Sequence, residues 1–195
     1  MDTMNMSTSW QCGLCNQVQS STQARAIIKS LEDEAANFQK DDISSLKMLL
    51  RKYGTKLHRN HTLIIELKQL LVSGMGRMPG YLMEEMSYSD MRLKMMLCTQ
   101  LLEVLDIVSP GLSLGRGLIL FELHSVLVTT ANMEYASTQD RRSLAMKLTE
   151  AASLLKEAVK ILSYESPDSE YGHLISASRD SEEQLAGYIQ SVSLM

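Results

Sequence analysis

The stretch Asp90–Ala136, DMRLKMMLCTQLLEVLDIVSPGLSLGRGLILFELHSVLVTTANMEYA, decides the fold of this chain. Both of its halves repeat apolar residues at steps of three and four, which is the spacing of one face of an α-helix. Ser109-Pro110-Gly111 separates the halves, because proline has no N–H to donate and disfavours helical geometry in the residue before it. We therefore expect an antiparallel helical hairpin on which the rest of the chain packs. The two stripes are Leu93, Leu97, Leu101, Val104 and Val108, then Leu120, Leu123, Leu127 and Ala131.

Composition points to helices throughout. Of the 195 residues, 45% are hydrophobic but only 5% are aromatic, and leucine and methionine dominate. These residues favour helices, whereas strands are enriched in aromatic and β-branched residues. The fold class is therefore predicted to be all-α, with antiparallel helical hairpins that form a bundle or a tetratricopeptide-like α-solenoid.

The chain divides into a polar start and a helical remainder. Residues 1–21 lack periodicity and are expected to form a flexible tail with a C-x-x-C knuckle, and residues 22–192 to form the helical domain. Three glycines and a proline in residues 74–80 predict a turn, with an interdomain hinge as the alternative. Asp41 or Asp42, and then Asn60, are the expected helix caps. Further helices are expected around residues 24–38, 43–57, 63–73, 81–86, 138–162 and 168–191.

Charge and cysteine content exclude several classes of protein. A formal net charge of −4 argues against a nucleic-acid surface, which needs clustered lysine and arginine. No apolar run approaches the roughly 20 residues that cross a bilayer, so no membrane association is expected. Three cysteines fit a reducing compartment without structural disulfides, and the expected location is cytoplasmic, nuclear or both.

Cys12 and Cys15 form the one metal-type spacing, since two thiolates in C-x-x-C can reach the same zinc ion. A structural zinc site needs four ligands, and His58 and His61 follow at a distance unlike that of common zinc modules. Zinc binding at Cys12 and Cys15 is therefore predicted for a site of which the sequence shows only two ligands. The alternative is a pair of unliganded thiols. Cys98 lies within an apolar helix and is expected to behave as a small hydrophobic residue.

Spacing alone suggests no catalytic constellation. His124 is surrounded by apolar residues one helical turn away on each side, so we expect a buried, hydrogen-bonded histidine. Asp106 and Glu122 interrupt apolar helices and are expected to bond a tyrosine, an arginine or a helix end. The many methionines predict core filling, with an adaptable binding surface as the alternative.

Three stretches taken together resemble a known family: Trp10-x-Cys12-x-x-Cys15, Leu57–His61 leading into Leu67-Lys68, and Pro110–His124. They look like the region after the SET domain in Smyd-type proteins, the SET- and MYND-domain lysine methyltransferases, and especially the arthropod SmydA branch. Ala151–Glu165 and Ser178–Tyr188 fit that branch's C-terminal helices, so the resemblance covers about residues 10–192.

The resemblance implies a C-terminal lobe without its enzyme. The family's SET and MYND domains would precede Trp10, so the chain is expected to be a truncated isoform, a partial gene product or a free-standing remnant. It would then be a non-catalytic interaction domain that binds a protein or peptide, such as a SET-domain lobe, with Phe121, Glu122 and His124 as interaction residues. Two alternatives stay open: a piece of an S-adenosylmethionine-dependent protein-lysine methyltransferase, and a small zinc-binding adaptor. No catalytic or cofactor-binding residue carries over to this sequence.

Overall fold

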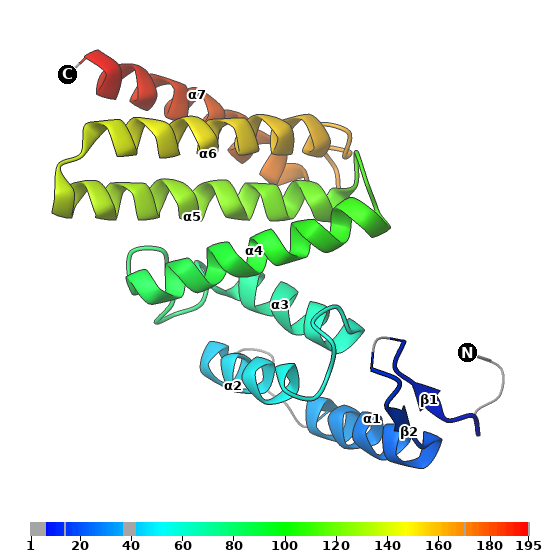
Figure 1. Cartoon of the computed structure of the whole chain (residues 1–195). Coiled ribbons are helices and arrows are strands. Elements are labelled where there is room, and N and C mark those ends of the chain that lie inside the picture. The colour runs from blue at the N-terminus through cyan, green and yellow to red at the C-terminus, as the bar shows by residue number, and fades with distance from the viewer. Residues whose placement is uncertain (1–6, 14, 37–41, 170, 195) are drawn as a thin grey trace. The chain divides into compact units, whose positions relative to one another are not determined.

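The computed structural model describes residues 7–13, 15–36, 42–169 and 171–194. Within these ranges the chain forms seven helices and two very short strands, which confirms the predicted all-α class (Figure 1). The elements are β1 Trp10–Gln11, β2 Val18–Gln19, α1 Ser21–Ala36, α2 Ile43–Gly54, α3 Thr62–Gly74, α4 Tyr88–Val108, α5 Leu114–Thr138, α6 Arg141–Leu162 and α7 Gly172–Leu194. The chain divides into two compact units, Met1–Lys40 and Asp41–Met195.

The first unit contains a hairpin in the region for which the sequence suggested a flexible tail. β1 and β2 pair antiparallel, with Trp10 opposite Gln19 and Gln11 opposite Val18. α1 follows directly and begins with a capping box. Ser20 Oγ accepts the Gln23 N–H at 3.3 Å, and Gln23 Oε1 accepts the Ser20 N–H at 3.4 Å. Phe38 and Asp41, which the sequence placed in the first helix and at the second cap, lie outside the described residues.

The second unit is a succession of antiparallel helices from α2 to α7 (Figure 1). Each helix packs on the next one along the chain, and the most extensive packing joins α5 to α6. The expectation that the rest of the chain packs on the α4–α5 hairpin is therefore wrong for α2 and α7, whose main neighbours are α3 and α6. Sequential packing arises because short connections keep consecutive helices adjacent.

Local hydrogen bonds fix where these helices begin. Asp42 caps α2, since its carboxylate accepts the N–H groups of Ser44 and Ser45 at 3.0 and 3.3 Å. The prediction that Asn60 caps α3 is wrong, because His61 does so by accepting the Leu63 N–H on its Nδ1 at 3.3 Å.

The connection between α3 and α4 is a set of turns within the second unit. The predicted short helix at residues 81–86 does not form. One oxygen of Glu85 accepts the N–H groups of Gly80 and Leu82 at 2.8 and 3.2 Å, which holds this backbone in turns. Gly76, with φ of 100°, donates its N–H to the Tyr81 carbonyl at 2.7 Å and thereby closes the loop.

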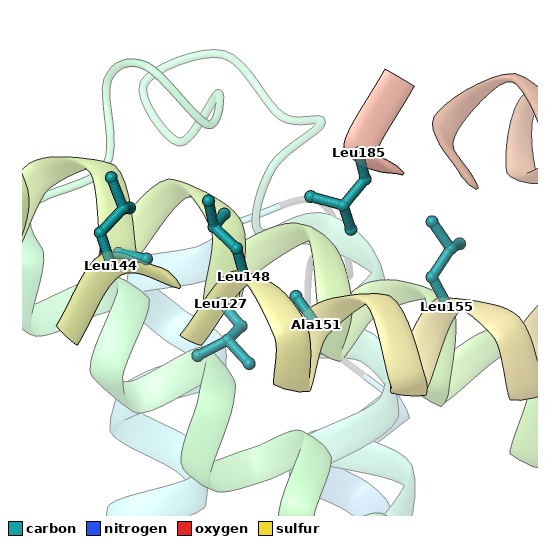
Figure 2. Close-up of a cluster of buried hydrophobic side chains, with 7 residues drawn as sticks. Leu127, Leu144, Leu148, Ala151, Leu155 and Leu185 are labelled. Atoms are coloured by element: carbon teal, nitrogen blue, oxygen red, sulfur yellow. The ribbon is translucent and has the colours of Figure 1, made fainter. Parts of the chain in front are cut away.

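A leucine and alanine core joins α5, α6 and α7. Figure 2 shows leucines along α6 with Leu127 of α5 and Leu185 of α7. Alanines such as Ala151 lie between them and let the helices approach closely. The contact is equally tight near the start of α5, where a Cβ on Gly117 would lie 2.9 Å from the Ile161 side chain. The buried members are Leu127, Ala131, Leu144, Leu148, Ala151, Leu155 and Leu185.

The apolar stripe predicted for α4 is only partly buried. Leu97 and Leu101 are in the core, but Val108 is 68% exposed. The buried face consists of Met91, Lys94, Leu97, Cys98 and Leu101. The last turns of α4 extend beyond the helices that pack on its middle. The apolar period of the sequence cannot show where that coverage stops.

By length and composition alone, α5 is long and apolar enough to cross a membrane, although the sequence predicted no apolar run of that length. Half of the 18-residue window is buried inside the protein. Its apolar side chains contact α4 and α6, and a core helix covered in this way passes the same test.

Candidate functional site

A cavity of the second unit lies between α3 and α5, and we call it the α3–α5 groove. Its volume is about 620 Å³, and residues just before and within the first turn of α7 also line it. The lining residues are Glu66, Gln69, Leu70, Val72, Ser73, Arg77, Gly115, Leu118, Ile119, Glu122, Tyr171, His173 and Leu174. Three elements far apart in the sequence therefore build one site.

The groove combines an apolar floor with a polar rim. Leu70, Leu118 and Leu174 are half-buried, so the groove leaves part of their apolar surface accessible. Glu66 and Arg77 are exposed on the rim, and the Arg77 side chain is 52% accessible. Such a site suits an apolar side chain of a partner that also makes polar contacts at the edge.

A buried ionic network forms the wall of the groove beside α5. Lys94 of α4 is only 1% exposed, and its ammonium donates to Glu122 Oε2 at 2.6 Å and to the Met75 carbonyl at 2.5 Å. The guanidinium of Arg77 pairs with the other Glu122 oxygen and donates to the Ser73 carbonyl at 2.7 Å. The network joins the end of α3 and the following connection to α4 and α5, which holds the wall rigid.

The three predicted interaction residues contribute to three different cavities. Glu122 lines the α3–α5 groove. Phe121 and Glu122 also line a small cavity of about 90 Å³ beside the α3–α4 connection. His124 instead lines a separate cavity between α5 and α7. No one of these three cavities is lined by all of Phe121, Glu122 and His124, although Phe121 and His124 contact each other.

His124 is the buried, hydrogen-bonded histidine that its apolar surroundings predicted. It is 6% exposed, its Nδ1 contacts the Phe121 carbonyl, and the two rings lie 4.8 Å apart between centroids. Burial lowers the pKa of His124 to about 4, against the opposing effects of the Phe121 carbonyl and the Glu122 charge. The imidazole is therefore neutral near pH 7, and Nδ1 must carry its proton because a carbonyl oxygen only accepts.

Asp106 and Glu122 both bond arginine, as the sequence suggested for acidic residues within apolar helices. Arg116 Nε donates to Asp106 at 2.8 Å, and its Nη1 donates to Glu157 of α6 at 2.6 Å. Arg116 thus links the ends of α4 and α6 through α5. Glu122 has Arg77 as its arginine and Lys94 as a second cationic partner.

Cys12 and Cys15 are exposed in the turn of the β1–β2 hairpin. The Cys12 N–H donates to the Gln17 carbonyl at 2.9 Å, and the Cys12 carbonyl accepts the Asn16 N–H at 3.0 Å. Across the part of the chain that the structure describes, no three histidine, cysteine or acidic side chains gather as a metal site. Zinc at this pair stays a prediction that requires ligands from elsewhere.

His58, His61 and Cys98 have local structural roles. The Nδ1 atoms of His58 and His61 accept the backbone N–H groups of Asn60 and Leu63, at 3.2 and 3.3 Å. The H-x-x-H spacing is thus used for the turn and the helix cap that lead into α3. Cys98 is fully buried, and burial raises the pKa of its thiol to about 12, so it remains a protonated apolar side chain, as predicted.

Sequence reasoning missed Lys94 and Arg77. Lys94 falls on the buried face of α4 between Met91 and Leu97, and a lysine in such a position requires a buried partner. That interruption of the apolar face was the available signal. Arg77 lies in the segment that the sequence indicated as a turn or a hinge, and its partner Glu122 is 45 residues away.

Both oxygens of Glu122 are engaged by cationic side chains, so this carboxylate maintains the wall of the site. The contacts available to a ligand are the apolar floor and the exposed rim groups. A scan against protein-family models matches no family, and a search of curated proteins finds no match to this chain.

Proposed function

We propose that this chain is a non-catalytic helical protein-interaction domain that binds a peptide segment in the α3–α5 groove. The observation that supports this is the cavity of about 620 Å³ with its apolar floor and fixed Glu122 wall. Cavities of roughly 300–1,000 Å³ with mostly apolar linings and a few polar groups are typical of ligand sites. A leucine, methionine or phenylalanine side chain of the peptide would fill the floor, while its backbone contacts Gln69 and Ser73 at the edge.

The resemblance to Smyd-type proteins suggests the kind of partner. In that family the corresponding helical lobe packs against a SET domain, so a SET-domain lobe is one partner that we propose for this chain. A rigid groove is consistent with such a role, because preorganised walls reduce the ordering cost of binding.

A peptide library displayed on phage, panned against the purified chain, tests the proposal. Selected peptides should share an apolar anchor and should bind with a Kd that fluorescence anisotropy can measure. Gln69→Arg and Leu118→Lys place charge in the groove and should weaken binding by about tenfold or more, the equivalent of about 1.4 kcal/mol. Gln69 is exposed, so its replacement leaves the core intact.

Met146→Lys is the matched control, because Met146 is 67% exposed on α6 and does not line the groove. Binding that survives both groove variants, or that Met146→Lys weakens equally, would contradict the proposed site. Calorimetry with S-adenosylmethionine tests the non-catalytic assignment separately. Measurable binding of this cofactor, or methyl transfer to a protein, would overturn that assignment.

A further inference from the structure

A second groove lies between α5 and α7, and we call it the α5–α7 groove. It has a volume of about 350 Å³ and shares no lining residue with the α3–α5 groove. The residues that line it are His124, Ser125, Val128 and Thr129 of α5 and Ser181, Gln184, Leu185 and Tyr188 of α7. None of these side chains is charged near neutral pH, because the pKa of His124 is lowered to about 4. Anything that binds here meets neutral hydrogen-bonding groups.

Three of the four hydroxyl groups that line this groove, those of Thr129, Ser181 and Tyr188, already donate their protons to other groups. Thr129 Oγ1 donates to the Ser125 carbonyl at 3.1 Å, and Ser181 Oγ donates to the Ala177 carbonyl at 2.8 Å. The Tyr188 hydroxyl donates to Asn132 Oδ1 at 2.7 Å. A hydroxyl has one proton and two lone pairs, so each of these oxygens retains only the capacity to accept.

His124 adds a further acceptor. Its Nδ1–H points to the Phe121 carbonyl, so Nε2 carries the free lone pair. Among the described residues no buried side-chain nitrogen or oxygen lacks a hydrogen-bond partner, and the side-chain hydrogen bond of His124 involves only Nδ1. Nε2 must therefore reach accessible space, and the cavity that His124 lines is the α5–α7 groove.

The α7 side of the groove is negative. α7 carries Asp180, Glu182 and Glu183 against the single basic residue Arg179. The two acidic residues of α5 add no unpaired charge, because Glu122 pairs with Arg77 and Lys94, and Glu134 pairs with Lys147. The acidic residues beside Ser181 attract cations and repel carboxylate or phosphate ligands.

We propose that the α5–α7 groove binds a primary alkylammonium group, which donates its N–H groups to His124 Nε2 and to the hydroxyl oxygens of Thr129 and Ser181. An ammonium has three donors and no acceptor, so it matches a groove whose fixed groups mostly accept. A lysine side chain of a polypeptide and a free diamine share this chemistry. The site is independent of the peptide groove proposed above.

Titration of the labelled full chain, followed by heteronuclear NMR, tests this inference. The probes are butane-1,4-diamine and Nα-acetyl-lysine N-methylamide, and butane-1,4-diol is the uncharged control. The amine probes should produce saturable shifts at residues 124–129 and 181–188, and the diol should not. Binding of the lysine derivative alone identifies a polypeptide source, and binding of the diamine alone identifies a free amine.

Two variants and a matched control locate the contact. Thr129→Val and Ser181→Ala should each weaken amine binding about three- to tenfold, since each removes one acceptor. Thr99→Val removes a similar hydroxyl-to-carbonyl bond, Thr99 Oγ1 to Met95 O at 3.0 Å, from α4 and should leave binding unchanged. Equal shifts with the diol, shifts outside the groove, or unchanged affinity in both groove variants would overturn the inference.

Discussion

Different chemistry holds together the α5–α6–α7 layer and the junction between α3 and α4. In the layer, leucines and alanines such as Leu148 and Ala151 meet without a polar atom (Figure 2). At the junction two lysines are buried instead, and each donates to a backbone carbonyl. Lys68 reaches Arg59 O at 3.1 Å, and Lys94 reaches Met75 O at 2.5 Å.

The difference reflects the connections that each region must accommodate. The connection between α5 and α6 is so short that nearly all backbone groups in this layer belong to helices. The stability of the layer therefore depends on the volume and fit of its side chains. The turns on either side of α3 leave carbonyls that a long cationic side chain can reach. Burial lowers the pKa of Lys68, with the Arg59 charge acting in the same direction, although Glu103 opposes them. We therefore expect the layer to respond to changes of volume and the junction to changes of charge.

The largest effect should come from removing volume from the layer. Leu148→Ala deletes a fully buried side chain and should lower the free energy of unfolding by about 2–5 kcal/mol. Met146→Ala, at an exposed position on the same helix, should change it by no more than about 0.5 kcal/mol. Urea unfolding followed by circular dichroism gives both values. Similar losses for the two variants would contradict a core confined to the leucine and alanine face.

The second effect concerns His124, the buried histidine of the layer. Its pKa is about 4 in the folded chain and near the ordinary 6.5 when unfolded, so the unfolded state binds more protons between these values. The contribution of neutral His124 to the free energy of unfolding should be fully present above pH 6.5. The free energy of unfolding should then fall by up to about 3 kcal/mol as the pH drops toward 4.

His124→Gln should flatten the stability profile between pH 6.5 and 4, whereas His173→Gln, at an exposed position, should leave it unchanged. Unfolding midpoints at several pH values measure this. The Lys147 ammonium and the Tyr88 hydroxyl hold the pKa of Glu134 below its usual 4.5. The stability that this carboxylate contributes is therefore lost only at a pH below the range in which His124 acts. A wild-type profile that is flat above pH 5 would refute the assignment to His124.

The third effect tests the charged junction. Lys94→Met keeps most of the side-chain volume but leaves the Met75 carbonyl without its donor, and it should cost about 1–3 kcal/mol. Lys156→Met, at an exposed site on α6, should be nearly neutral. Chemical denaturation compares the two. If Lys94→Met equals or exceeds the parent in stability, apolar packing can replace the network and the proposed contrast fails.

The smallest effect compares two helix glycines. Gly117→Ala would place a Cβ 2.9 Å from Ile161 and push α5 from α6, so we expect a loss of about 1–2 kcal/mol. Gly187→Ala meets nothing within 4 Å in α7 and should gain about 0.5–1 kcal/mol from helix propensity. Thermal melting should therefore shift in opposite directions. A shift of the same sign in both would show that α5 and α6 are not in tight contact at Gly117.

Features encoded within a few residues were predictable. The break at Ser109-Pro110-Gly111, the Asp42 cap and the buried positions Leu120, Leu127 and Ala131 follow from local sterics, capping and helical period. α4 was predicted to end at Val108, as it does, but the burial of its last turn was mispredicted, because period alone cannot reveal where a neighbouring helix stops covering the surface. The His61 cap was missed because an imidazole nitrogen replaced the usual short polar side chain.

The candidate site was less predictable than the helices. Glu122 was identified as an acidic residue that needs a cationic partner, but its partners Lys94 and Arg77 come from other elements. The α3–α5 groove also includes Leu174, more than 50 residues after Leu118. Spacing within one helix carries no information about such contacts.

Helix content, helix breaks and the apolar faces are properties of neighbouring residues, and the amino-acid order alone is enough to establish them. The order of packing, the pairing of Lys94 with Glu122 and the two grooves depend on which helices meet and at what separation. These three features depend on the volume and charge of side chains that come from segments far apart in the chain. They therefore form only when the helices pack together.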